Sequence, residues 1–177
     1  MTHATASLAD ELAVCSRRDI HMARERAPVH VLGGGPSGLA AALTANRAGR
    51  HVIVHERAPN VGHRFHDDLQ GLENWTAEGD VLEELGALGI NSTFDHTAIR
   101  EVVVFDPHHR AHTYRSRQPL FYLVRRGSSS GTLDCSLKAQ AVSRGIDVRF
   151  GTAPHRLRDG GIVAAGPGGT NATVVGY

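Results

Sequence analysis

The chain has 177 residues, which corresponds to one domain by the usual range of about 100 to 200 residues per domain. Hydrophobic residues make up 41% of it, enough for a core, and the formal net charge of +1 lacks the basic surplus of a nucleic-acid-binding domain. Its two cysteines form no disulfide framework or C-x-x-C pattern, and no apolar run reaches the ~18 residues of a transmembrane helix, so we expect a soluble cytoplasmic protein.

The first 27 residues differ in pattern from the rest of the chain, and we interpret 1–27 as an N-terminal extension of a domain that covers 28–177. Ser7 to Cys15 has the spacing of a short amphipathic helix, whereas Arg17 to Arg26 is polar and basic. Met22 lies shortly before the first apolar strand, so both Met1 and Met22 fit as start codons.

Pro28 to Arg57 carries the most informative pattern of the chain. An apolar strand, a glycine-rich loop, an alanine-rich helix at Ser37 to Ala48 and a second strand at His51 to His55 succeed one another. The unbroken apolar run Val52 to Val54 is typical of a parallel strand that is buried on both faces. This order is the signature of a dinucleotide-binding βαβ unit.

Three glycines in the loop, Gly33, Gly35 and Gly38, have separate expected roles. Gly33 permits the tight turn out of the strand, Gly35 lets the backbone approach a pyrophosphate, and Gly38 lets the helix pack closely on the sheet. The free N–H groups and the partial positive charge at the start of the helix favour the same anion.

Glu56 ends the second strand, about twenty residues after the loop, where the fingerprint requires an acidic residue. Its carboxylate can accept hydrogen bonds from both ribose hydroxyls of an adenosine, and its charge would repel a 2′-phosphate. The pattern therefore predicts FAD or NAD rather than NADP. The alternative is a glycine-rich turn in an ordinary α/β protein, with Glu56 merely solvated.

The rest of the chain is less strongly patterned. Val61 to Gly71 is polar and predicts a loop, Asp80 to Leu88 predicts a helix, and a β-rich stretch comes after it. A second helix is expected at Asp134 to Arg144, with Leu137, Ala141 and Val142 facing inward. The last expected elements are an alternating strand at Ile146 to Phe150 and a short apolar strand at Gly161 to Gly166.

Two of the histidine groups raise the question of a metal site. One contains His63, His66, Asp67 and Asp68, and the other contains His108, His109 and His112. Neither spacing gives a convincing ligand set, so we predict no metal. The second group comes after Asp106-Pro107 between the β-like runs Val102 to Phe105 and His112 to Tyr114, which indicates a solvated hairpin tip.

Several motifs along the chain carry a family resemblance. They are the glycine loop with Glu56-Arg57, the pair Gly62 and Arg64, Tyr122-Leu-Val-Arg-Arg before Thr132-Leu-Asp, and Ile162-Val-Ala-Ala-Gly-Pro. Together they resemble the first half of an FAD-dependent oxidoreductase, and most closely the geranylgeranyl-reductase-like group. The resemblance implies an α/β, Rossmann-like FAD/NAD(P)-binding fold of the glutathione-reductase type, with FAD as cofactor and NAD(P)H as electron donor.

The same resemblance implies a set of cofactor-binding residues. Gly33, Gly35, Pro36, Ser37 and Gly38 would hold the pyrophosphate and Glu56 the ribose, and Arg57, Arg64 and Gly166 would complete the site. Either Arg125 or Arg126 would reach the phosphate or ribose region of FAD, because the loop Gly127 to Gly131 leaves the offset open. The alternative for that arginine is a surface charge beside the loop.

The sequence also departs from the family. His63 stands where a second glycine is common, and Ala165 where a threonine is usual. The later glycine-aspartate motif and the substrate-binding sheet do not occur, so we expect a truncated first half whose partner is a missing C-terminal half or a second copy. The small-molecule substrate and the catalytic residues cannot be read from the sequence. The alternatives are an NAD-binding domain of a dehydrogenase or reductase, an FAD-dependent aromatic monooxygenase, and a non-enzymatic nucleotide-binding module.

Overall fold

A computed structural model describes residues 27–76, 78–154, 157 and 160–166. The expected N-terminal helix at Ser7 to Cys15 and the alternative start at Met22 lie outside these residues. In the described part of the chain, no helix combines the length and the apolar character needed to cross a lipid bilayer.

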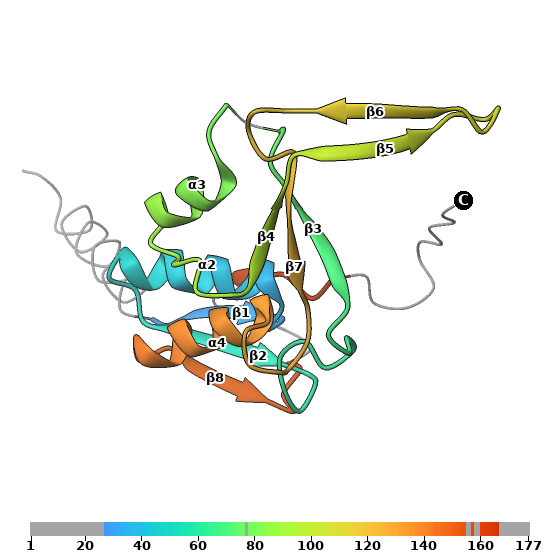
Figure 1. The fold of residues 1–177 in the computed structure, drawn as a ribbon. Coiled ribbons are helices and arrows are strands. Elements are labelled where there is room, and N and C mark those ends of the chain that lie inside the picture. The colour runs from blue at the N-terminus through green and yellow to red at the C-terminus, as the bar shows by residue number, and fades with distance from the viewer. Residues whose placement is uncertain (1–26, 77, 155–156, 158–159, 167–177) are drawn as a thin grey trace, which may run out of the picture.

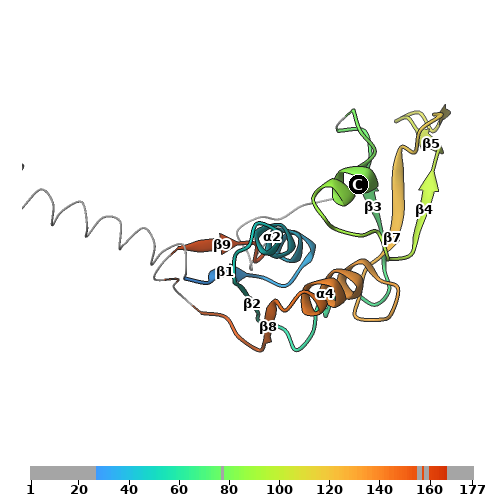
Figure 2. The same ribbon diagram turned by 90° about the vertical axis from the view of Figure 1, so that its left-hand side faces the viewer.

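A four-stranded parallel sheet in the order β8-β2-β1-β9 forms the base of the fold (Figure 1). Its strands are β1 (Val29–Leu32), β2 (Val52–Glu56), β8 (Asp147–Phe150) and β9 (Gly161–Val163). The helices α2 (Pro36–Arg47) and α4 (Leu133–Ser143) lie side by side on one face of the sheet (Figure 2). The chain therefore has the predicted α/β Rossmann-like fold, and the bounds of both helices agree with the prediction to within one residue.

The main core lies between this sheet and the two helices. Val52, Ile53 and Val54 in β2 are all buried, as the unbroken apolar run predicted. The helix side of the sheet contributes Val31, Val52 and Val54, and the helices contribute Leu39, Leu43, Leu137 and Ala141. Burial of such side chains supplies the main stabilisation of the unit.

The buried side of α4 differs from the prediction at one residue. Leu133, Leu137 and Ala141 are buried, at a spacing of four residues, but Val142 is 58% exposed. The prediction that Val142 faces inward was therefore wrong. One residue beyond Ala141 is a rotation of about 100° around the helix, which turns Val142 away from the sheet and toward solvent.

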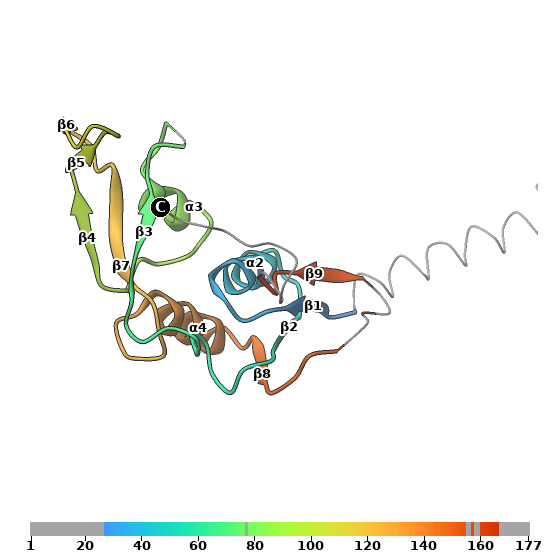
Figure 3. The same cartoon turned by 90° about the vertical axis from the view of Figure 1, so that its right-hand side faces the viewer.

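A three-stranded antiparallel sheet, in the order β3-β7-β4, stands beside the parallel sheet (Figure 3). It consists of β3 (Leu69–Glu73), β4 (His96–Ile99) and β7 (Phe121–Arg125), with the short helix α3 (Val81–Ala87) between β3 and β4 in the sequence. The loop expected through Gly71 ends at Asp68, because β3 begins at Leu69. Four of the five β3 residues are exposed, so this strand lacks the alternating apolar pattern by which strands are found.

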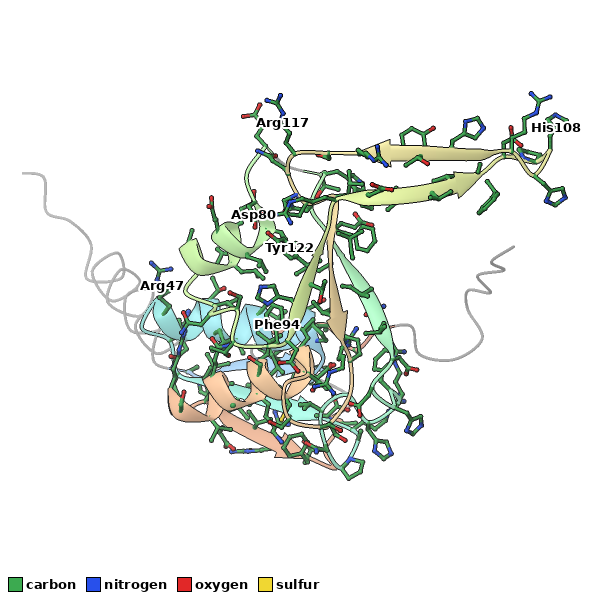
Figure 4. All side chains as sticks on the ribbon, in the orientation of Figure 1. Arg47, Asp80, Phe94, His108, Arg117 and Tyr122 are labelled. Atoms are coloured by element: carbon green, nitrogen blue, oxygen red, sulfur yellow. The ribbon has the colours of Figure 1, made fainter. Side chains whose placement is uncertain are left out.

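The strands β5 (Glu101–Phe105) and β6 (Ala111–Arg115) pair with each other as an antiparallel ribbon. The predicted hairpin is thus confirmed. Figure 1 shows that the ribbon projects away from both sheets, and Figure 4 places His108 at its tip and Arg117 at its base.

Candidate nucleotide-binding site

A cavity of about 630 Å³ opens where β1, β2 and β9 end. Ligand pockets commonly measure about 300 to 1,000 Å³, and open α/β sheets bind ligands at the carboxyl ends of their strands. The lining residues are Gly33, Gly35, Pro36, Ser37, Glu56, Arg57, Ala58, Pro59, Asn60, Gly62, His63, Arg64, Phe65, Arg126, Asp134, Ala164, Ala165 and Gly166. They come from four segments that are far apart in the sequence.

Two of the three loop glycines are required by the fold itself. Gly33 has a φ of 106°, and a Cβ atom there would collide with the carbonyl of Ala164. A Cβ atom at Gly38 would collide with the carbonyl oxygen of Gly33. These contacts agree with the expected roles of a tight turn and of close packing between helix and sheet.

Gly35 is different, because nothing in the fold excludes a side chain there. Its backbone is extended, with φ −76° and ψ 178°, and a Cβ atom would have no neighbour within 4 Å. Gly35 lines the cavity, so a side chain would occupy space that is otherwise open to a ligand. This glycine is therefore explained by what the cavity holds and not by packing.

The N-terminus of α2 opens on the same cavity. Gly35 is its N-cap, no described side chain caps the helix, and the first turn contains no acidic residue. In contrast, the Asp80 carboxylate caps α3 and the Thr132 hydroxyl caps α4. Uncapped N–H groups at a helix start are a favourable place for an anion.

Backbone hydrogen bonds hold the carboxylate of Glu56 at the rim of the cavity. Its Oε2 accepts a hydrogen bond from the N–H of Gly34 at 2.6 Å, and its Oε1 accepts one from the N–H of Ala58 at 2.7 Å. Each carboxylate oxygen has a second acceptor position, so the group can still accept two hydroxyls. The backbone contacts fix its orientation before a ligand binds.

The loop after β2 brings positive charge to the opening. Arg57 and Arg64 line the cavity and are exposed, as is His63, which stands where a second glycine is common in the family. The guanidinium groups of Arg64 and Arg126 lie over the ring of Phe65, at 4.8 and 4.4 Å from its centre. Arginine over an aromatic face is a favourable cation–π contact.

The two candidate arginines after β7 have different surroundings. Arg126 lines the cavity and is nearly buried, with its Nε and Nη2 donating to the Asp134 carboxylate at 2.7 and 2.9 Å. Arg125 lies outside the lining and donates through Nη2 to Asp95 at 2.6 Å, near the surface. The structure thus brings Arg126, and not Arg125, to the predicted site.

Further predicted site residues line the same cavity. Pro36 and Ser37 line the cavity at the start of α2, and Gly166, with a φ of 67°, lines it beyond β9. Sequence reasoning missed Phe65 and Asp134. Asp134 had a usable signal, because an acidic residue in the first turn of a helix is a natural partner for the arginine pair that precedes it.

The two histidine groups lie in different parts of the fold, and His63 of the first group lines the cavity. His108, His109 and His112 are exposed on the β5–β6 ribbon, where the His112 Nε2 lies 3.1 Å from the Asp106 carboxylate. Among the residues that the structure describes, no group of three or more His, Cys, Asp or Glu side chains is arranged to hold a metal ion.

Comparisons with known proteins agree with this fold. Residues 31–104 match the profile of the NAD(P)-binding Rossmann-like domain family. A stretch of 55 residues, 31% of this chain, is 56% identical to glutamate synthase [NADH] of Schizosaccharomyces pombe and covers 2% of that protein.

Solved structures show the same likeness. A geranylgeranyl bacteriochlorophyll reductase-like protein from Thermoplasma acidophilum matches with a TM-score of 0.53 and 21% identity, over 70% of this chain and 30% of that one. The 2-methyl-3-hydroxypyridine-5-carboxylic acid oxygenase matches with a TM-score of 0.52 and 25% identity, over 70% and 31%. The chain thus has a Rossmann-like fold and shares it with the N-terminal part of these proteins, about a third of their length.

Proposed function

We propose that the cavity binds the adenosine diphosphate part of FAD and that the chain is the FAD-binding part of an oxidoreductase. The observation that carries this proposal is Gly35, a residue with ordinary backbone angles whose missing side chain leaves space only in the cavity. A pyrophosphate is the group that such a glycine admits at a helix N-terminus.

The residues around the cavity fit the cofactor. The free N–H groups of the first turn of α2 would hold the pyrophosphate, and Arg57 and Arg64 would add positive charge from the opposite loop. Glu56, held by two backbone N–H groups, would accept the ribose hydroxyls and repel a 2′-phosphate. The flavin, when bound, supplies the redox chemistry, and the protein supplies binding and orientation.

NAD is the second candidate ligand, since the glycine loop and Glu56 serve either dinucleotide equally. The match to the NAD(P)-binding domain family and the identity to an NADH-dependent glutamate synthase favour it. The fold shared with a reductase-like protein and an oxygenase favours FAD, together with the sequence motifs at Arg126 and Gly166.

The broader reaction depends on the FAD assignment. We infer a cytoplasmic oxidoreductase that takes electrons from NAD(P)H and acts on a small molecule, either as a reductase or as a monooxygenase.

Calorimetry with ADP tests the site on the full chain. Replacing Gly35 by Val should abolish ADP binding while the unfolding midpoint changes little, because the added carbons fill only the cavity. Gly86→Val is the matched control: Gly86 lies in α3, away from the cavity, and a Cβ atom there also has no neighbour within 4 Å. Equal ADP affinity in the Gly35→Val protein and the wild type would refute the site.

The choice of ligand is tested on the wild-type protein. We expect FAD to bind more tightly than NAD⁺, and 5′-AMP more tightly than 2′,5′-ADP because of Glu56. A preference for NAD⁺ would move the assignment to the second candidate, and a preference for 2′,5′-ADP would contradict the role of Glu56.

A further inference from the structure

The β5–β6 ribbon lacks the support that two-stranded ribbons normally require. Every residue of its two strands is exposed except Val102, which is half-buried. Its apolar side chains Val103, Val104, Phe105 and Tyr114 are between 51% and 65% exposed. An isolated hairpin is marginally stable in water, so a ribbon of this composition is expected to have a partner layer.

The outer edge of β5 is the surface open to such a partner. Within the described residues β5 pairs only with β6, in the register Glu101↔Arg115 to Phe105↔Ala111. The N–H of Asp106 donates to Arg110 O and the N–H of Ser116 donates to Arg100 O. These two bonds show which residues of β5 point their backbone groups toward β6 and which point them away. Because hydrogen-bonded and non-hydrogen-bonded pairs alternate along an antiparallel ladder, Glu101, Val103 and Phe105 direct their N–H and C=O groups away from β6.

This edge is complementary to itself. If two β5 strands pair antiparallel about a two-fold axis at Val103, the outward backbone groups of residues 101, 103 and 105 meet as hydrogen-bonded pairs. Val102 then lies opposite Val104 of the second copy, and Arg100 lies opposite its Asp106. The pairing thus matches β-branched residues with each other and a cation with an anion.

The outer edge of β6 does not have this property. Antiparallel self-pairing about Thr113 would place His109 opposite Arg117 of the second copy and would bring Arg110 to Ser116. These contacts offer neither apolar pairs nor opposite charges. Figures 1 and 4 show in addition that the ribbon extends clear of the rest of the fold from Arg117 to His108, so a second copy can reach its length.

We propose that the β5–β6 ribbon is a self-association arm, in which β5 pairs antiparallel with β5 of a second copy about a two-fold axis at Val103. The result is a continuous four-stranded sheet in the order β6-β5-β5-β6 across the two chains. The arm lies apart from the nucleotide cavity, so the dimer does not depend on the bound ligand.

Proline substitutions test the edge, because the two strands offer a matched pair of positions. The N–H of Val103 faces the proposed interface, whereas the N–H of Thr113, its partner in the ribbon, faces the outer edge of β6. Neither N–H is used inside the ribbon, so either proline is tolerated by the ribbon itself. By sedimentation equilibrium, Val103→Pro should raise the dimer dissociation constant about tenfold or more, and Thr113→Pro less than about threefold.

A cysteine at the axis supplies a second measurement that does not weaken the edge. Hydrogen-bonded pairs have Cα atoms about 5.5 Å apart, within the reach of a disulfide, so Val103→Cys should form covalent dimers on mild oxidation. Thr113→Cys and the wild type, with its native cysteines, should form far fewer. A wild-type protein that stays monomeric, equal effects of the two prolines, or no cross-link at Val103→Cys would overturn the proposal.

Discussion

The ion pair between Arg126 and Asp134 is buried, so the loss of one partner should have a measurable effect on stability. Asp134 is 1% exposed, and its carboxylate accepts hydrogen bonds from Arg126 Nε, Arg126 Nη2 and the N–H of Gly127 at 2.7, 2.9 and 3.1 Å. Arg126 also donates to Gln70 in β3. The pair therefore connects α4 to the antiparallel sheet at the wall of the cavity.

Replacing Asp134 by Ala should lower the free energy of unfolding by about 3 to 5 kcal/mol, because a buried guanidinium and the Gly127 N–H lose their acceptor. A domain of this size has a total stability of about 5 to 15 kcal/mol, so the loss is a large fraction of it. The double variant Arg126→Met/Asp134→Leu should be less destabilised than either single charge deletion, because it leaves no unpaired charge.

Urea unfolding followed by circular dichroism on the wild type, Arg126→Met, Asp134→Leu and the double variant measures the coupling, and Asp134→Ala is unfolded beside them. We expect the cost of the double variant to be smaller than the sum of the two single costs by about 2 kcal/mol or more. Additive costs, or a loss below about 1 kcal/mol for Asp134→Ala, would show that the pair is solvated and would refute the argument.

Two further predictions concern the stability of the fold. Gly38→Ala should lower the free energy of unfolding by about 2 kcal/mol or more, because its Cβ atom would collide with the Gly33 carbonyl. Thermal melting measures the loss, and the control variant Gly86→Ala should not show it. The hydrogen bond from Tyr122 Oη to the Asp80 carboxylate, at 2.6 Å, raises the pKa of Tyr122 from its ordinary 10.0 to about 12. The stabilisation from this hydrogen bond is complete below pH 10 and is lost as the pH rises through 12. The difference in the free energy of unfolding between the wild type and Tyr122→Phe, measured in urea, should therefore shrink over that range. A difference that stays constant would mean that the hydrogen bond contributes nothing.

The sequence predicted the part of the fold whose determinants are local. The requirement for glycine at Gly38 comes from its contact with the Gly33 carbonyl inside one βαβ unit, and Gly33 needs its φ of 106° for the turn after β1. The contact of Gly33 with Ala164, in contrast, is distant in the sequence and could not be predicted. The strand β3 was not predicted, because its side chains are mostly exposed and give no alternating apolar pattern. The strand forms by backbone pairing with β7, some fifty residues away in the sequence. The exposure of Val142 was also missed, because an apolar residue at helical spacing does not by itself show which side of α4 packs against the sheet.

The same distinction applies to the site. Glycine spacing and Glu56 indicated the cavity, but the choice between Arg125 and Arg126 depended on which of them meets Asp134 and which meets Asp95. Those partners are brought to the two arginines by a loop and a helix start, and sequence order alone gives no distance between them. The three-dimensional structure was needed to show that Arg126, and not Arg125, lines the cavity.

The cavity brings together segments that lie far apart in the sequence. Its walls include the β1–α2 turn, the loop after β2, the β7–α4 connection and Ala164 to Gly166 beyond β9. A molecule that touches all four acts as a non-covalent cross-link between the two ends of the domain, and its binding free energy adds to that of folding. A ligand bound there would thus protect newly made chains from proteolysis by an amount that rises with its concentration and affinity.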